Sequence, residues 1–218
     1  MSSPQAARPI RKLPDLQRSA FWLYGATATV MREPMGLVLR HAFEAGFHNW
    51  QVRLEVLRLA VVLLLLSRLF LISGLYYEKV FMQPEAATDY PRRSYPLDFL
   101  AGLAQFMIGA AMTTVMSTHL RLAGGVSPFV LITVAFLSVD ILWLLIAAAR
   151  GFSTVPVIAA HTKVNATMLV AGTIVWGVAR GAGADAVLAD QAALGLLAAW
   201  TFYRILQQIR IYEALDRG

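Results

Sequence analysis

Long apolar segments separated by short polar ones dominate the sequence. A helix that crosses a bilayer needs about 20 mostly apolar residues, and five windows meet this requirement: 56–77, 97–120, 128–149, 157–179 and 187–206. Pro96, Pro128 and Pro156 stand at or beside three of the starts, where a missing N–H costs little and a fixed φ suits a helix. The pattern therefore predicts an all-α, multi-pass transmembrane helix bundle of about five spans.

The predicted bundle covers residues 55–208, between a basic tail (1–54) and a short polar tail (209–218). Within the first tail, apolar or small residues recur at helical spacing on one face: Met35, Val38, Leu39, Ala42, Phe43 and Gly46. This spacing predicts an amphipathic helix on the membrane surface or against the bundle. A helix that docks onto a partner protein would show the same pattern.

Two connections affect the number of spans. The Gly-rich segment 180–185 predicts a tight turn between antiparallel neighbours. The window 157–179 has an alternative, because His161, Lys163 and Asn165 near its start also suit a re-entrant or interfacial loop. A four-span arrangement therefore stays open.

Composition supports a membrane location, with 58% apolar and 15% charged residues. Soluble chains average about 45–50% apolar and 25% charged residues. The absence of cysteine excludes disulfides, thiolate metal sites and a cysteine nucleophile. The first residues lack the pattern of a secretory signal peptide. We expect an integral protein of a plasma or inner membrane.

The net charge of +6 includes five cations in the first 32 residues. No aromatic-interleaved basic groove accompanies them, so they favour membrane-flanking charge over nucleic-acid binding. In a five-span arrangement, cations in the short flanks favour an outside amino terminus, whereas counting the whole tail favours an inside one. We expect the amino terminus inside, and an even number of spans would remove the conflict.

Two charges fall deep within the predicted spans. Arg68 and Asp140 each lie 12 residues into parallel spans, roughly 18 Å from the same face. A lone charge at the centre of a span costs about 2.5–3.5 kcal/mol. We therefore predict an Arg68–Asp140 ion pair or a shared polar cluster.

Other polar residues accompany this pair. Gln105, His161 and Asn165 fall near the same level. Asp98 begins a stripe of small and polar residues in window 97–120, and it would lie at the mouth of a path that the stripe lines. A second polar layer nearer the opposite face would contain Arg58, His119, Asp190 and Gln191. Two interpretations fit: small and polar residues that fix helix packing, or a hydrated path for a solute, an ion or a proton.

Arg92 and Arg93 lie between Tyr90 and Tyr95, just before a predicted span. They fit contact with anionic lipid or with an acidic partner. Ordinary membrane-flanking charge with interfacial tyrosines gives the same pattern.

Motifs for chemistry are missing from the sequence. The four histidines lack Glu-x-x-His or His-x-x-x-His spacing, and the chain has no G-x-S-x-G motif or phosphate loop. We therefore expect no catalytic residues, metal or cofactor. The leading hypothesis is a small membrane carrier or channel-like protein, oligomeric because so few helices enclose little polar space. The alternative is a non-catalytic structural or assembly subunit of a larger membrane complex.

Overall fold

A computed structural model describes residues 13–77, 90–149 and 156–215. This part of the chain forms six α-helices and one short 3-10 turn, without β-strands. The helices are α1 (Leu13–Ala45), α2 (Trp50–Tyr77), α3 (Tyr90–Thr114), α4 (Pro128–Ala149), α5 (Pro156–Gly181) and α6 (Ala186–Leu215). The 3-10 turn η3 (Ala123–Gly125) precedes α4. The all-α class expected from the sequence is confirmed.

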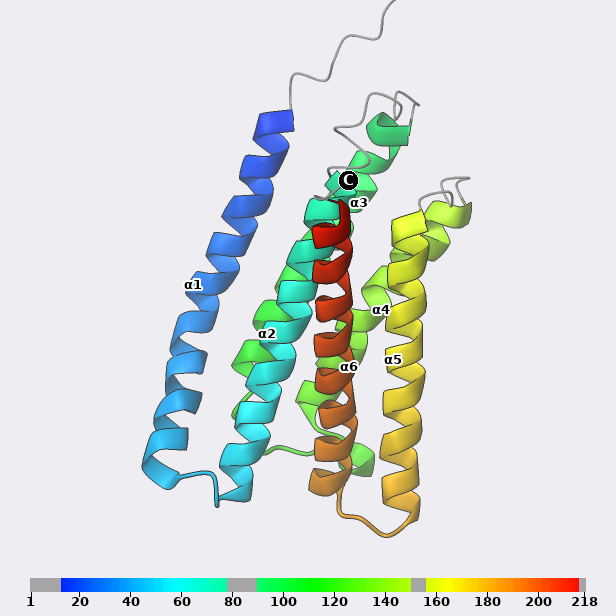
Figure 1. Cartoon of the computed structure of the whole chain (residues 1–218). Coiled ribbons are helices and arrows are strands. Elements are labelled where there is room, and N and C mark those ends of the chain that lie inside the picture. Colours follow the sequence, from blue (N-terminus) through cyan, green and yellow to red (C-terminus); the bar gives the residue numbers. More distant parts are fainter. Residues whose placement is uncertain (1–12, 78–89, 150–155, 216–218) are drawn as a thin grey trace, which may run out of the picture.

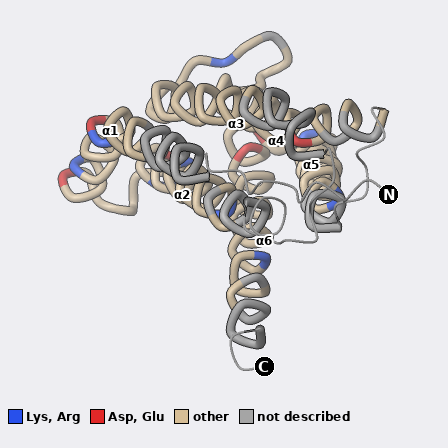
Figure 2. Tube along the Cα trace, turned by 90° about the horizontal axis from the view of Figure 1, so that it is seen from above, with Lys and Arg blue, Asp and Glu red and all other residues tan. Residues whose placement is uncertain are grey.

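The helices run up and down in chain order, so that the first turn of α1 and the last turn of α6 lie at the same end of the bundle (Figure 1). Viewed along the bundle, α1 lies at one edge and α5 at the other (Figure 2). α2 contacts α1, α3, α5 and α6, and is the central helix of the bundle. Its Leu54, Val61, Val62 and Leu65 belong to the main apolar core.

Local sequence signals mark where several helices begin and where the chain turns between them. The side chains of Asn49, Ser127 and Asp185 accept hydrogen bonds from backbone N–H groups at the starts of α2, α4 and α6, as N-cap residues do. Gly124 and Gly125 have φ of 80° and 83°. This left-handed conformation favours glycine, and it turns the chain between α3 and α4.

The amino-terminal segment differs from its expected form. The amphipathic stretch after Pro34 forms the last third of a 33-residue helix that continues through Pro34. This helix, about 50 Å long, packs along α2 and α3 and buries Met31 and Val38. Of the expected placements, contact with the bundle is therefore the one observed.

Other boundaries also move. The expected helix through residue 120 is wrong, because α3 ends at Thr114 and the chain turns at 115–117. At the carboxyl end, α6 continues to Leu215, through most of the segment expected to be a polar tail. Residues 128–149 form a helix with the bounds expected from the sequence.

Length and composition identify one candidate membrane span among the described residues, Ala186–Gln207 in α6. Two further helical stretches, Leu100–Thr114 and Pro128–Trp143, are apolar but shorter. The multi-pass arrangement stays a prediction.

Candidate functional site

A buried polar network joins four helices within the bundle. It consists of Arg68 from α2, Gln105 from α3, Asp140 from α4 and Asn165 from α5, and we call it the deep network. All four side chains are buried, between 1% and 7% exposed. Sequence reasoning placed these four residues in one cluster, and the structure brings them together.

Asn165 lies between the two charges of the deep network. Its side-chain oxygen accepts a hydrogen bond of 2.5 Å from the Arg68 guanidinium, and its side-chain nitrogen donates to the Asp140 carboxylate. Gln105 donates to the other oxygen of that carboxylate. Both carboxylate oxygens therefore accept from amides, while the opposite charges of Arg68 and Asp140 attract each other.

The surroundings of the network are partly polar. The Arg68 guanidinium lies 3.5 Å from the Met168 sulfur, and the positive charge of Arg204 on α6 repels it. Thr162 stands one turn before Asn165 on α5, and its buried hydroxyl has no hydrogen-bond partner among the described residues. A buried polar group left unsatisfied costs about 1–3 kcal/mol.

A second set of polar side chains lies at the end of the bundle where α1 turns into α2, and we call it the end layer. Its Arg58 donates to the carbonyls of Met116 and Thr118 at 2.7 and 2.8 Å. The guanidinium also lies over the Phe129 ring, 5.4 Å from its centroid. Arg58 thus satisfies carbonyls in the turn that follows the end of α3.

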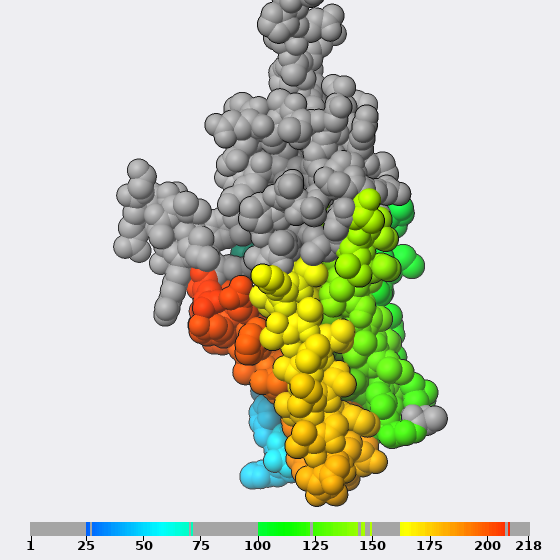
Figure 3. Space-filling view, turned by 90° about the vertical axis from the view of Figure 1, so that its right-hand side faces the viewer, coloured from blue at the N-terminus to red at the C-terminus, as the bar shows by residue number. Residues whose placement is uncertain are grey.

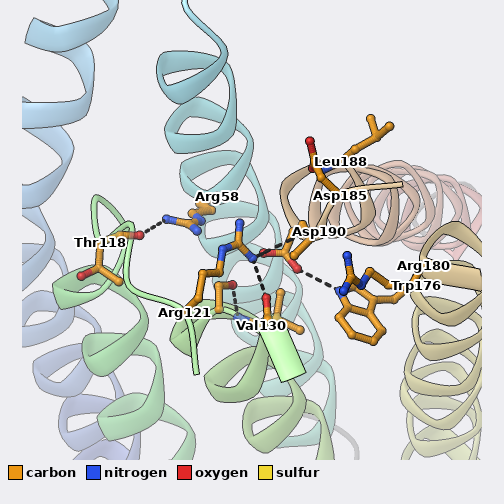
Figure 4. Close-up of polar contacts among 12 residues, drawn as sticks. Arg58, Thr118, Arg121, Val130, Trp176, Arg180, Asp185, Leu188 and Asp190 are labelled. Atoms are coloured by element: carbon orange, nitrogen blue, oxygen red, sulfur yellow. Dashed lines mark hydrogen bonds and ion pairs between the residues drawn. The ribbon is translucent and has the colours of Figure 1, made fainter. Parts of the chain in front are cut away.

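Asp190 is the anionic centre of the end layer. It is fully buried, forms an ion pair with Arg121, and accepts a 3.0 Å hydrogen bond from the Trp176 indole (Figure 4). Arg121 also donates to the carbonyls of Gly125 and Ala186. The Asp190 carboxylate therefore ties α5 and α6 to the loop before α4.

Glu55 completes the end layer at the α1 side. Its buried carboxylate lies 3.1 Å from His41 Nδ1 on α1 and 3.7 Å from His119 Nε2 in the loop after α3. Sequence reasoning missed Glu55, Arg121, Trp176 and Thr162. For Glu55 a signal existed, since it precedes Arg58 by three residues and so shares its side of the helix.

The other expected site residues have different outcomes. Gln191 is half-buried beside Asp190 on α6, but its side chain makes no hydrogen bond among the described residues. Asp98, Arg92 and Arg93 lie on α3 and His161 lies on α5, but their side chains are outside the described residues. The path mouth and the lipid or partner contact therefore stay predictions.

An apolar cavity of about 180 Å³ lies between α4, α5 and α6. It separates the deep network from the end layer. Met168 lines it and also contacts Arg68 of the deep network. Trp176 lines it and also contacts Asp190 of the end layer. The other residues that line the cavity are almost all aliphatic, and an apolar cavity of this kind disfavours bound water.

Among the described residues, no group of three or more His, Asp or Glu side chains is arranged to hold a metal ion. In comparisons with known proteins, the chain matches no family model, no curated protein and no solved structure. The geometry alone therefore carries the functional argument.

Proposed function

We propose that this chain is a multi-pass integral membrane protein whose deep network lies on the path of a proton or small charged solute. The observation that carries the proposal is the Arg68–Asn165–Asp140–Gln105 network, buried at the level of predicted spans and built from four helices. Ionisable residues at such depth typically mark ion and proton paths. Asp140 is the proposed acceptor and Arg68 its counter-charge.

The balance of charges in the deep network depends on whether Asp140 is ionised. With Asp140 ionised, the two formal charges cancel, and both carboxylate oxygens accept from amides. A proton or cation at Asp140 would remove this balance of charges, which favours rearrangement of the helices that hold the network. The aliphatic stretch between the deep network and the end layer would act as the closed barrier of the path.

The order of the helices supports a single orientation. If α1 crosses the membrane together with the five expected spans, the count becomes six and both termini lie on one side of the membrane. The segments before α1, between α2 and α3, between α4 and α5, and after α6 hold six cations in sequence, whereas the three connections at the other end hold only Arg121. By the positive-inside rule both termini would be cytoplasmic. A carboxyl-terminal reporter fusion tests this orientation.

Reconstituted vesicles test the path. Purified protein in vesicles carrying a pH-sensitive dye inside should raise proton flux above that of empty vesicles under an imposed potential. Na⁺, K⁺ and Cl⁻ gradients extend the assay to small ions. Asp140→Asn should lower the flux at least tenfold while the protein stays folded. Asp185→Asn is the matched control, because Asp185 is exposed on the α5–α6 turn, and it should keep the flux of the native protein.

A structural role is the alternative, in which the deep network only fixes the register of four helices within a larger membrane assembly. The apolar residues exposed on α1 and just after it favour this role, since Phe43 is 88% exposed and Leu37, Leu39 and Phe47 are exposed as well. A charge swap separates the two proposals. The structural role is supported by two results together. The double variant Arg68→Asp with Asp140→Arg regains the folding that each single variant loses, and the flux of every tested ion equals that of empty vesicles for both the native protein and the double variant. A homo-oligomer is proposed in either case, and light scattering of the detergent-solubilised protein measures it.

A further inference from the structure

The cavity between α4, α5 and α6 has features that the proposed path does not use. Figure 3 shows this face, with α5 between α4 and α6. Leu131 and Thr173 line the cavity and are exposed at the surface, so the cavity opens outward between α4 and α5. An almost wholly aliphatic lining is a poor route for a charge. It suits an apolar ligand.

The volume fits part of an acyl chain. Apolar cavities of about 150 Å³ stay dry and bind molecules the size of benzene, and this one measures about 180 Å³. Along α5 it extends from Trp176 to Met168, eight residues or about 12 Å. This length matches several methylene groups of an extended chain.

A cation lies at the Trp176 end of the cavity. The Arg180 guanidinium lies over the Trp176 ring, 5.9 Å from its centroid, and donates to the Ala184 carbonyl. Among the described residues it has no carboxylate partner. A Cβ added at Gly125 would lie 3.9 Å from the Arg180 guanidinium, and Gly125 is adjacent to Val126, which lines the cavity. The cation therefore lies beside the end of the cavity that Val126 and Trp176 line.

We propose that this cavity is a binding site for an amphiphile with an anionic head and an acyl chain. The chain occupies the space between α4, α5 and α6, and the head contacts Arg180. Trp176 is held in place by its hydrogen bond to Asp190 and forms the boundary between the two parts of the site. A phospholipid of the bilayer and a free fatty acid share this chemistry. The inference rests on the proposed membrane location but not on transport.

Fluorescence quenching tests the site in detergent, without any flux measurement. Bromine atoms midway along an acyl chain quench nearby tryptophans, and the quenching lost in Trp176→Phe is assigned to Trp176. Three probes are titrated: brominated phosphatidylglycerol, brominated phosphatidylcholine and brominated oleate. We expect quenching of Trp176 by at least one anionic probe at a lower concentration than by phosphatidylcholine. The tighter of the two anionic probes identifies the source of the ligand.

Two variants locate the site. Gly172 lines the cavity, and a Cβ added there meets nothing within 4 Å. Gly172→Leu should therefore be accepted at its Cβ, place the rest of its side chain in the cavity and abolish the quenching. Gly177→Leu is the matched control on the same helix, because a Cβ there also meets nothing within 4 Å and Gly177 does not line the cavity. It should keep the native response.

Arg180→Gln tests the head. Removal of one cation near an anionic lipid is worth about fivefold in affinity, so the apparent affinity for the anionic probe should fall about fivefold, to that of phosphatidylcholine. The proposal is overturned if phosphatidylcholine quenches as well as both anionic probes in the native protein, or if Gly172→Leu and Gly177→Leu respond alike.

Discussion

The deep network and the end layer both contain buried charges, but they satisfy them differently. In the deep network the Asp140 carboxylate accepts from the side-chain amides of Gln105 and Asn165, and the Arg68 guanidinium donates to the amide oxygen of Asn165. In the end layer, Arg58 and Arg121 donate to backbone carbonyls that the helix ends and the loop before α4 leave available.

The difference follows from the position of each set along the helices. Carbonyls within a helix are already bonded to N–H groups four residues on, whereas the last four carbonyls are not. A charge deep in the bundle must therefore find side-chain partners on other helices. The free energy of burying such a charge therefore depends on how those helices are rotated relative to one another. A charge near a helix end has backbone partners beside it, and a single substitution leaves some of them in place.

The largest loss in free energy of unfolding is expected when only one charged partner of the deep network is replaced. Asp140→Leu removes the carboxylate that attracts the buried Arg68 charge, and removing one partner of a buried charge pair typically costs about 3–5 kcal/mol. The double variant Arg68→Met with Asp140→Leu should regain most of this loss, because apolar replacements of both partners are often close to neutral. Unfolding in mild detergent, followed by circular dichroism, measures both. Equal losses in the single and double variants would contradict the account of a paired network.

A smaller effect is expected in the end layer. Asp190→Asn removes the ion pair with Arg121, but Arg121 keeps its bonds to the carbonyls of Gly125 and Ala186. We expect a loss of about 1–2 kcal/mol in the same unfolding measurement, the usual range for hydrogen bonds to charged groups and between helices in membranes. A loss as large as that of Asp140→Leu would mean that the backbone carbonyls do not compensate.

The smallest effect is expected outside both sets. Arg40 and Glu44 form an exposed pair on α1, 2.6 Å apart, and solvent screens such pairs strongly. Arg40→Ala should leave the unfolding midpoint unchanged within error. A clear decrease would show that this end of α1 depends on surface charge, rather than on the buried contacts of Met31 and Val38.

The sequence predicted the parts of the fold that depend on local pattern. The prolines and apolar runs placed α4 at its observed bounds and α5 within two residues of them. The matched depth of Arg68 and Asp140 predicted a shared polar cluster, because the rise per residue in a helix is constant. The position of α1 could not be predicted in this way, since its apolar face suits lipid, a partner protein or the bundle equally well.

The tertiary structure decided which groups meet within each level. Depth along an axis follows from residue number, but the direction of a side chain across the bundle depends on how neighbouring helices are rotated and tilted. Only the assembled bundle places Asn165 between Arg68 and Asp140, and directs Arg58 to the carbonyls after α3 while Arg121 takes Asp190. The sequence by itself determined where most of the helices lie and the levels of Arg68 and Asp140. Packing in three dimensions determined their partners, because those contacts join residues that lie 25 to 97 positions apart.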